Sequence, residues 1–253
     1  MTDAVRHEEK AVSLTPYLLL GVLALLLALI ARAPASLMQK AVPAGIPVAV
    51  SAWGGTLWQG QASLLFGSQP AFLEWRVQPK RLLGGRLAAD VQSRGEMTLS
   101  AKAELGLKGW ALREGHGEIP SAVLQALLPP GWSLPGSVQA ENLQLARQGH
   151  GSGPWLEAGG RLHWGGGAMQ YHLENQSQAA TLPALVLDMR LEGETLVLAL
   201  SEEAGSLGLA LLRLEPDGTV EARVRERLLR YTPGYRSSGG DPDAVVVTAR
   251  QKL

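Results

Sequence analysis

Residues 208–227 read GLALLRLEPDGTVEARVRER, and this stretch decides the fold class predicted for most of the chain. The Pro-Asp-Gly at 216–218 supplies turn chemistry, since proline presets the bend and glycine accepts a positive φ. From Val220 to Arg225 apolar residues alternate with charged ones. A period of two gives one apolar and one charged face, as in a half-buried antiparallel strand. The stretch therefore predicts a β-hairpin.

The same pattern recurs in other parts of the chain. Residues 136–146 (GSVQAENLQLA) alternate, and residues 161–174 (RLHWGGGAMQYHLE) predict two strands around three glycines. Two short helical candidates stand among the strands. Residues 119–129 (IPSAVLQALLP) predict a helix that Pro120 can begin, and residues 34–47 (PASLMQKAVPAGIP) predict an amphipathic helix or a linker.

The predicted fold is mainly β: a curled antiparallel sheet with one or two short helices. Thirty glycines and fifteen prolines among 253 residues are typical of a domain with many turns. Strands with one apolar face must pack on another layer or line a groove. Because two short helices cover little of a sheet, a sheet closing on itself and an open apolar trough are both consistent with the pattern.

An uncharged segment, LTPYLLLGVLALLLALIA at residues 14–31, precedes the β-rich part. As a helix it would be about 27 Å long at a rise of 1.5 Å per residue, close to the apolar thickness of a bilayer. It is longer than the apolar part of a cleaved signal peptide, which favours an uncleaved transmembrane helix. We expect its N-terminus inside, since large domains are translocated largely regardless of charge.

The composition excludes several functional classes. The chain has 23 lysine and arginine residues and 23 aspartate and glutamate residues. Its formal net charge is therefore zero, and it has no excess of positive charge that would attract nucleic acid. Cysteine is absent, which excludes disulfides and thiolate metal sites.

Catalytic motifs give no support to an enzyme. The nearest approach to a nucleophile elbow is GWSLP at 131–135, where Pro135 replaces the last glycine of G-x-S-x-G. The histidines at 116, 150, 163 and 172 lack the spacing of a helical metal site. We predict no enzymatic activity, no catalytic residues, no cofactor and no metal.

The tryptophans leave one binding alternative open, a carbohydrate platform. They are spread along the chain rather than grouped, which favours packing over a sugar groove. The seven are Trp53, Trp58, Trp75, Trp110, Trp132, Trp155 and Trp164.

Two neighbouring motifs carry a family resemblance. The apolar segment runs into APASLM at 33–38, and SAWGGTLWQGQA follows at 51–62. This arrangement resembles the N component of bacterial type II secretion systems, the GspN family. The matching exit from the helix is Ala33, Pro34 and Ala35, and the matching structural motif consists of Gly55, Thr56, Leu57, Trp58 and Gly60, with Ala62 after it. Residues 134–145, 159–164, 182–200 and 214–224 follow the order of strands and turns in the family.

The resemblance implies a non-catalytic inner-membrane accessory of the type II secretion system, which exports folded proteins across the outer membrane. It implies a cytoplasmic segment 1–13, a transmembrane helix 14–31, a linker or helix 32–47 and a periplasmic β-rich domain 48–253. Partners would be other inner-membrane or secretin components. Residues 231–253 do not align with the family and read as a basic loop before a last strand.

A fainter similarity to AsmA-like proteins implies an alternative function. Long sheets in that group curl around an apolar groove and are linked to lipid handling. The domain would then bind or transfer lipid in the periplasm. A membrane-tethered carbohydrate-binding protein is the third hypothesis.

Overall fold

The computed structural model describes residues 15–41, 49–67, 69–82, 84–128, 130–149, 153–173, 176–205, 207–233, 235–236 and 239–252. The predicted cytoplasmic segment 1–13, Leu14 of the predicted transmembrane helix and residues 42–48 at the end of the linker lie outside these ranges, as does His150.

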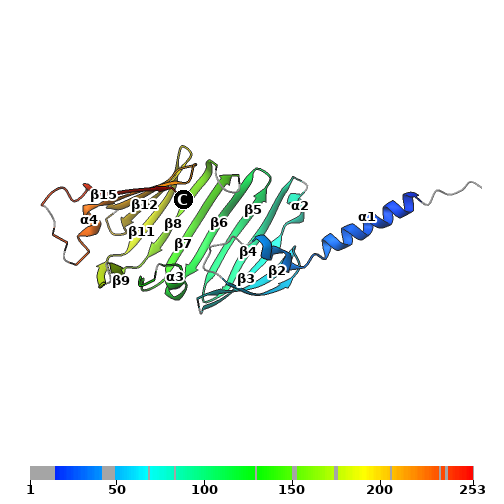
Figure 1. Ribbon diagram of the computed structural model, residues 1–253, viewed down its shortest axis with the longest axis horizontal. Helices are drawn as coiled ribbons and strands as arrows, with labels where there is room; N and C mark the ends of the chain where they lie inside the picture. Colours follow the sequence, from blue (N-terminus) through cyan, green and yellow to red (C-terminus); the bar gives the residue numbers. More distant parts are fainter. Residues whose placement is uncertain are drawn as a thin grey trace, which may run out of the picture.

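A single antiparallel sheet of 13 strands makes up most of the protein (Figure 1). The strands follow one another in chain order, except that β8 pairs with β11. The intervening β9 and β10 form a separate two-stranded hairpin. The strands are β1 (Ala49–Gly55), β2 (Gln59–Phe66), β3 (Gln69–Val77), β4 (Arg86–Gly95), β5 (Thr98–Gly106), β6 (Gly109–Ile119), β7 (Val138–Gln148), β8 (Trp155–Trp164), β9 (Gly167–Leu173), β10 (Gln176–Leu182), β11 (Leu185–Glu192), β12 (Thr195–Glu202), β13 (Gly208–Leu214), β14 (Thr219–Arg225) and β15 (Val245–Lys252).

The predicted hairpin at 208–227 is confirmed, and so is the mainly β class. Strand β13 pairs with β14 from Leu214 opposite Val220 to Ala210 opposite Val224. Residues directly opposite each other in antiparallel strands point to the same face. The alternation of apolar and charged residues along one strand therefore lines up with the alternation in its neighbour.

The two faces of the sheet therefore differ in chemistry along its whole length. One row of opposed residues runs from Leu162 through Leu187, Leu200 and Ala210 to Val224. We call this apolar side the trough face. The neighbouring row on the other side, the outer face, is made of Arg161, Asp188, Ala199, Leu211 and Arg223.

Five short or medium helical elements accompany the sheet: α1 (Thr15–Ala31), the 3₁₀ helix η1 (Ala35–Ala41), α2 (Pro79–Leu82), α3 (Ser121–Leu127) and α4 (Glu226–Leu229). The helix beginning after Pro120 is confirmed as α3. The expectation of one or two short helices was too low, because α2 and α4 are single turns that have no periodic apolar pattern to predict them.

The uncharged segment forms α1, which extends from one end of the sheet (Figure 1). Across the described ranges, α1 included, the structure contains no helix with both the length and the apolar character needed to cross a bilayer.

Connections of different kinds gather at the two rims of the sheet. At one rim, which we call the turn rim, strands join through short turns such as residues 107–108 and 193–194. At the other, the long rim, the connections 120–137, 165–184 and 226–244 carry α3, the β9–β10 hairpin and α4. Strand direction alternates in an antiparallel meander, so successive connections fall on alternate rims.

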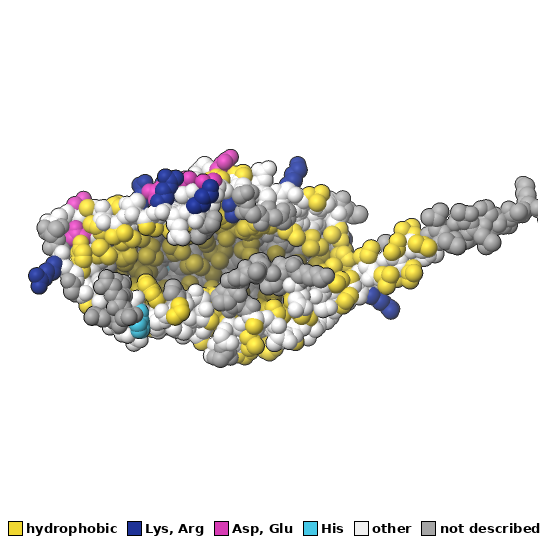
Figure 2. Space-filling model, viewed as in Figure 1, with side chains coloured by type: hydrophobic (Ala, Val, Ile, Leu, Met, Phe, Trp, Pro, Cys, Tyr) yellow, Lys and Arg dark blue, Asp and Glu magenta, His cyan; other side chains and the backbone are white. Residues whose placement is uncertain are grey.

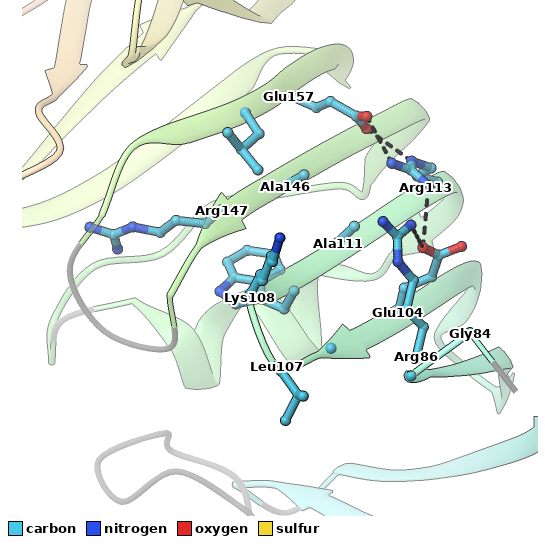
Figure 3. Close-up of a pocket in the computed structure, with 15 residues that line it drawn as sticks. Gly84, Arg86, Glu104, Leu107, Lys108, Ala111, Arg113, Ala146, Arg147 and Glu157 are labelled. Atoms are coloured by element: carbon cyan, nitrogen blue, oxygen red, sulfur yellow. Dashed lines mark hydrogen bonds and ion pairs between the residues drawn. The ribbon is translucent and has the colours of Figure 1, made fainter. Parts of the chain in front are cut away.

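The outer face is held by ion pairs that cross strands. The Arg113 guanidinium on β6 donates two hydrogen bonds to the Glu157 carboxylate on β8, with N···O distances of 2.9 and 2.8 Å. They reach over Ala146 on the intervening strand β7 (Figure 3). These hydrogen bonds from Arg113 are the main cause that lowers the pKa of Glu157, and partial burial opposes them.

This ion pair predicts a dependence of stability on acid. The folded-state pKa of Glu157 lies below its ordinary value of 4.5, so the stabilisation is complete above pH 4.5 and is lost as the pH falls through the folded value. We expect Glu157→Gln to flatten the fall in unfolding free energy below pH 4.5, as measured by urea titration at several pH values. The effect is small, because the side chains of Arg113 and Glu157 are 38% and 40% exposed.

The matched control is Glu96→Gln, an exposed carboxylate in the turn between β4 and β5. An acid-dependence curve for Glu157→Gln that overlays that of the unchanged protein contradicts the assignment.

Candidate functional site

The turn between β1 and β2, residues 54–60, binds the exit of the N-terminal helix. The Trp58 indole Nε1 donates a hydrogen bond of 2.8 Å to the carbonyl oxygen of Ile30, near the end of α1. The Leu57 amide donates to the Ala33 carbonyl at 2.8 Å. Pro34 and Thr56 form an isolated β-bridge. We call residues 54–60 the corner, because the helix and the sheet join there.

Two glycines allow the corner to close. Gly55 has φ of +81°, which L side chains rarely adopt. At Gly60 a Cβ atom would lie 2.3 Å from Trp75 Cζ2 and 2.8 Å from the carbonyl oxygens of Gly54 and Thr56. Gly60 therefore permits a close backbone approach, and the bend of the corner rests on the positive φ of Gly55.

The corner is continuous with the core beneath it. The Trp75 Nε1 donates to the Leu57 carbonyl at 3.1 Å. Ala35 of η1 is 2% exposed and packs in a cluster with Ala62, Trp75 and Val77, against which Trp58 and Trp53 lie half-buried. Helix exit, corner and first strands thus form one packed unit.

The structure brings the five motif residues Gly55, Thr56, Leu57, Trp58 and Gly60 together at this corner. Their status as the signature of a family stays a prediction. Sequence reasoning assigned Trp58 to the structural motif but missed its hydrogen bond to Ile30, 28 residues earlier. No periodic pattern links these two positions. The one sequence signal for this contact is that the motifs at 33–38 and 51–62 lie close together in the chain.

The second candidate site is the trough face. Figure 2 shows a hollow along the long axis in which hydrophobic side chains gather, with charged groups along its border. Its middle is lined by half-buried aliphatic residues from successive strands. These include Ala103, Leu112, Leu145, Leu162, Leu187, Met189, Leu198, Leu200, Leu212, Ala222 and Val224.

In the part of the chain that the structure describes, packed clusters cover the margins of this trough and leave its middle uncovered. At the long rim, Val123 of α3 is 1% exposed and packs with Phe66, Ala71 and Met97. Further along that rim Leu209 is fully buried beside Trp164, Leu182 and Leu185. At the corner, η1 covers the trough face near β2 and β3.

Two further concavities lie on the sheet. One, of about 400 Å³, lies among residues of β4 to β8 and contains Arg86, Glu104, Arg113 and Glu157 (Figure 3). Four of its charged groups are paired: Glu104 lies 3.7 Å from Arg86 and 3.4 Å from Arg113, and Arg113 lies 2.8 Å from Glu157. The other, of about 500 Å³, lies over β1 to β4, where Arg94 pairs with Glu74 at 3.3 Å. Paired charges of this kind serve the sheet rather than a ligand.

Histidines and tryptophans occupy separate local environments. His116 Nδ1 lies 2.8 Å from the Glu114 carbonyl oxygen, and His172 Nδ1 lies 2.8 Å from that of Gly131. In the described part of the chain, no three His, Cys, Asp or Glu side chains gather as a metal site. Trp75, Trp155 and Trp164 are buried, and five tryptophans pack against another aromatic ring in three pairs: Trp53 with Trp75, Trp110 with Trp155 and Trp132 with Tyr171.

Fold and site together define a class: a single-layer antiparallel β-sheet protein with an apolar trough and an apolar helix attached at one corner. Residues 47–234 match the family model described as type II secretion system protein N, a range that includes strands β1 to β14. The chain belongs to this family, and the resemblance inferred from sequence is confirmed. Curated proteins and solved structures give no match.

The packing at Gly60 predicts a clear stability difference between two glycines. Gly60→Ala should lower the free energy of unfolding by about 1–3 kcal/mol, because the new methyl meets Trp75 and backbone oxygens. Gly159→Ala on β8 is the control, since its Cβ would meet nothing within 4 Å. Urea unfolding of the full chain in detergent, followed by tryptophan fluorescence, measures both. Equal stability of the two variants would falsify the close approach.

Proposed function

We propose that the protein is a non-catalytic accessory of the type II secretion system that supports export of folded proteins from the periplasm. The observation that carries this proposal is the family match over 47–234, which takes in all but the last strand of the sheet. Its partners are other inner-membrane or secretin components of the same machine.

The proposal places the protein at the bacterial inner membrane. The uncharged segment 14–31 is its single-pass anchor, with residues 1–13 in the cytoplasm, 32–47 as the linker and 48–253 in the periplasm. Support comes from the composition of the segment, which contains no charged residue. The corner supports it further, because Trp58 and Leu57 fix the sheet to the end of α1.

Deletion of the gene tests the secretion role. Proteins normally exported by the system should accumulate in the periplasm, while their total amount stays constant and a resident periplasmic protein is not released. Expression of the full chain should restore export. Normal export in the deletion strain would overturn the proposal.

Replacement of the anchor separates its role from that of the domain. A cleavable signal peptide takes the place of residues 1–31, so that the sheet is released into the periplasm. If the anchor is needed, this form fails to restore export although it is present at the level of the full chain.

A second candidate function is binding of lipid acyl chains in the trough. The observation that favours it is the chemistry of the trough face, where aliphatic side chains from β5 to β14 follow one another while charges stay on the outer face. An unbranched hydrocarbon chain can lie along such a surface without leaving polar groups unpaired. The apolar helix α1 joins the sheet at the corner, next to one end of the trough.

A pair of leucines on neighbouring strands tests the lipid function. Leu198 on β12 belongs to the trough face, and Leu211 on β13 belongs to the outer face; both are half-buried. Leu198→Glu should reduce labelling by phosphatidylethanolamine that carries a photoreactive group on an acyl chain, because a carboxylate in the trough must be desolvated. Leu211→Glu should retain labelling.

Helix α1 is the same in both variants, so contacts of the label with the helix cancel in the comparison. Equal labelling of Leu198→Glu and Leu211→Glu would argue against lipid in the trough.

A further inference from the structure

Arg147, near the end of β7, places a positive charge on the trough face. Its partners across the strands are Trp110 of β6 and Trp155 of β8. Strands β6 and β7 pair without a register shift over residues 145–148, so Arg147 lies on the same face as Leu145. The ion pairs that link the strands lie on the outer face, and Arg147 therefore departs from the general sorting of charges.

The Arg147 guanidinium is half-buried and has no carboxylate partner in the part of the chain that the structure describes. Its Nε donates to the Gly153 carbonyl oxygen and its Nη2 to the Pro216 carbonyl oxygen, both at 3.1 Å, while Nη1 donates to no described residue. Its Cζ lies 4.9 Å from the centre of the Trp155 ring. Carbonyl dipoles and an aromatic face stabilise a cation but carry no opposite charge, and a cation removed from water ordinarily has an anionic partner.

A second donor next to Arg147 lacks an acceptor. Trp155 is 6% exposed, and its Nε1 is buried without a hydrogen bond to any described residue. The ring packs edge-to-face with Trp110 at a centroid distance of 6.0 Å. Buried N–H groups nearly always donate to the protein, to water or to a ligand. Two neighbouring donors, one of them charged, thus point to an anionic acceptor that the described residues do not supply.

The two donors lie where the curled sheet brings two turns together. The Gly153 amide donates to the Pro216 carbonyl at 3.3 Å, although β11 and β12 separate β8 from β13 in the sheet. Arg147 extends away from the ion pairs of the neighbouring concavity (Figure 3). On the same face Leu145 and Leu112 stand opposite each other and begin the aliphatic lining of the trough. A cationic group and an apolar surface thus adjoin, in the order that suits a lipid with an anionic head group.

We propose that Arg147 and Trp155 bind the phosphate of a phospholipid whose acyl chains lie along the trough. The planar guanidinium matches the oxygens of a phosphate and binds them through charge-assisted hydrogen bonds. A membrane phospholipid supplies this phosphate together with hydrocarbon chains for the aliphatic residues that follow. The proposal rests on the lipid function of the trough and adds the orientation of the lipid, with its head group at the turn rim and its chains toward the middle.

Photolabelling of the full chain in non-ionic detergent with two matched lipids tests this site. One probe is phosphatidylethanolamine with a photoreactive acyl chain, and the other is diacylglycerol with the same chain and no phosphate. The phospholipid should label the unchanged protein roughly tenfold more strongly, which is the scale of a charge-assisted hydrogen bond. Arg147→Gln should bring the two probes to equal labelling. Arg223→Gln, on the outer face of β14, is the matched control and should keep the preference.

The ratio of the two labels separates phosphate binding from a structural role of Arg147. A variant that only loosens the turns loses labelling by both probes, so that its ratio stays that of the unchanged protein. Trp155→Phe provides a second variant, because it keeps an aromatic ring beneath the guanidinium and removes the N–H donor. Its preference for the phospholipid should fall as well.

Three outcomes overturn the head-group site. A preference that persists in Arg147→Gln does so, and the lipid function then stands if Leu198→Glu still reduces labelling by both probes. If Leu198→Glu has no effect with either probe, the lipid function and the head-group site fall together. If inorganic phosphate without lipid raises the urea midpoint of the unchanged chain, but not that of Arg147→Gln, relative to chloride at equal ionic strength, the site takes a free anion and the lipid assignment is wrong.

Discussion

The architecture depends on one constraint, an apolar sheet face over whose middle the described residues form no second layer. Most strands from β3 to β15 carry aliphatic residues on one face and charges on the other. A flat sheet of this kind would expose the whole apolar face to water at about 25 cal/mol per Å². Twist and curling bring the aliphatic side chains of neighbouring strands closer together, which explains why residues such as Leu198 and Leu212 are only half-exposed.

The long connections relieve the same constraint at the margin of the sheet. They all fall on the long rim, where α3 and the segment from Glu226 to Tyr231 place Val123, Leu228 and Tyr231 against the trough face. At the turn rim, the corner and η1 have this role over β2 and β3. Among the described residues, these connections pack at the margin of the trough rather than across its middle.

Much of this fold follows from local sequence, and the rest depends on contacts between distant residues. Alternation predicted the β13–β14 hairpin, and Pro120 predicted the start of α3. Residues 161–174 were predicted to contain two strands around three glycines, and β8 and β9 confirm this, but the pattern did not show that β8 pairs with β11 and β9 with β10. Alternation identifies a strand but not its partner, since every apolar face in this sheet is alike. For the same reason the sequence left open whether the sheet closes or remains a trough.

The corner shows how a short motif can have a structural role without binding a ligand or catalysing a reaction. Trp75 fills the space that a side chain at residue 60 would occupy, and its indole holds the Leu57 carbonyl. Leu57 and Trp58 in turn hold the carbonyls of Ala33 and Ile30. A displacement at the helix end therefore passes through four hydrogen-bonded or packed residues into β3 and the trough. The tryptophans and glycines of this stretch act by fixing the helix to the sheet, and a ligand is not needed to explain their presence.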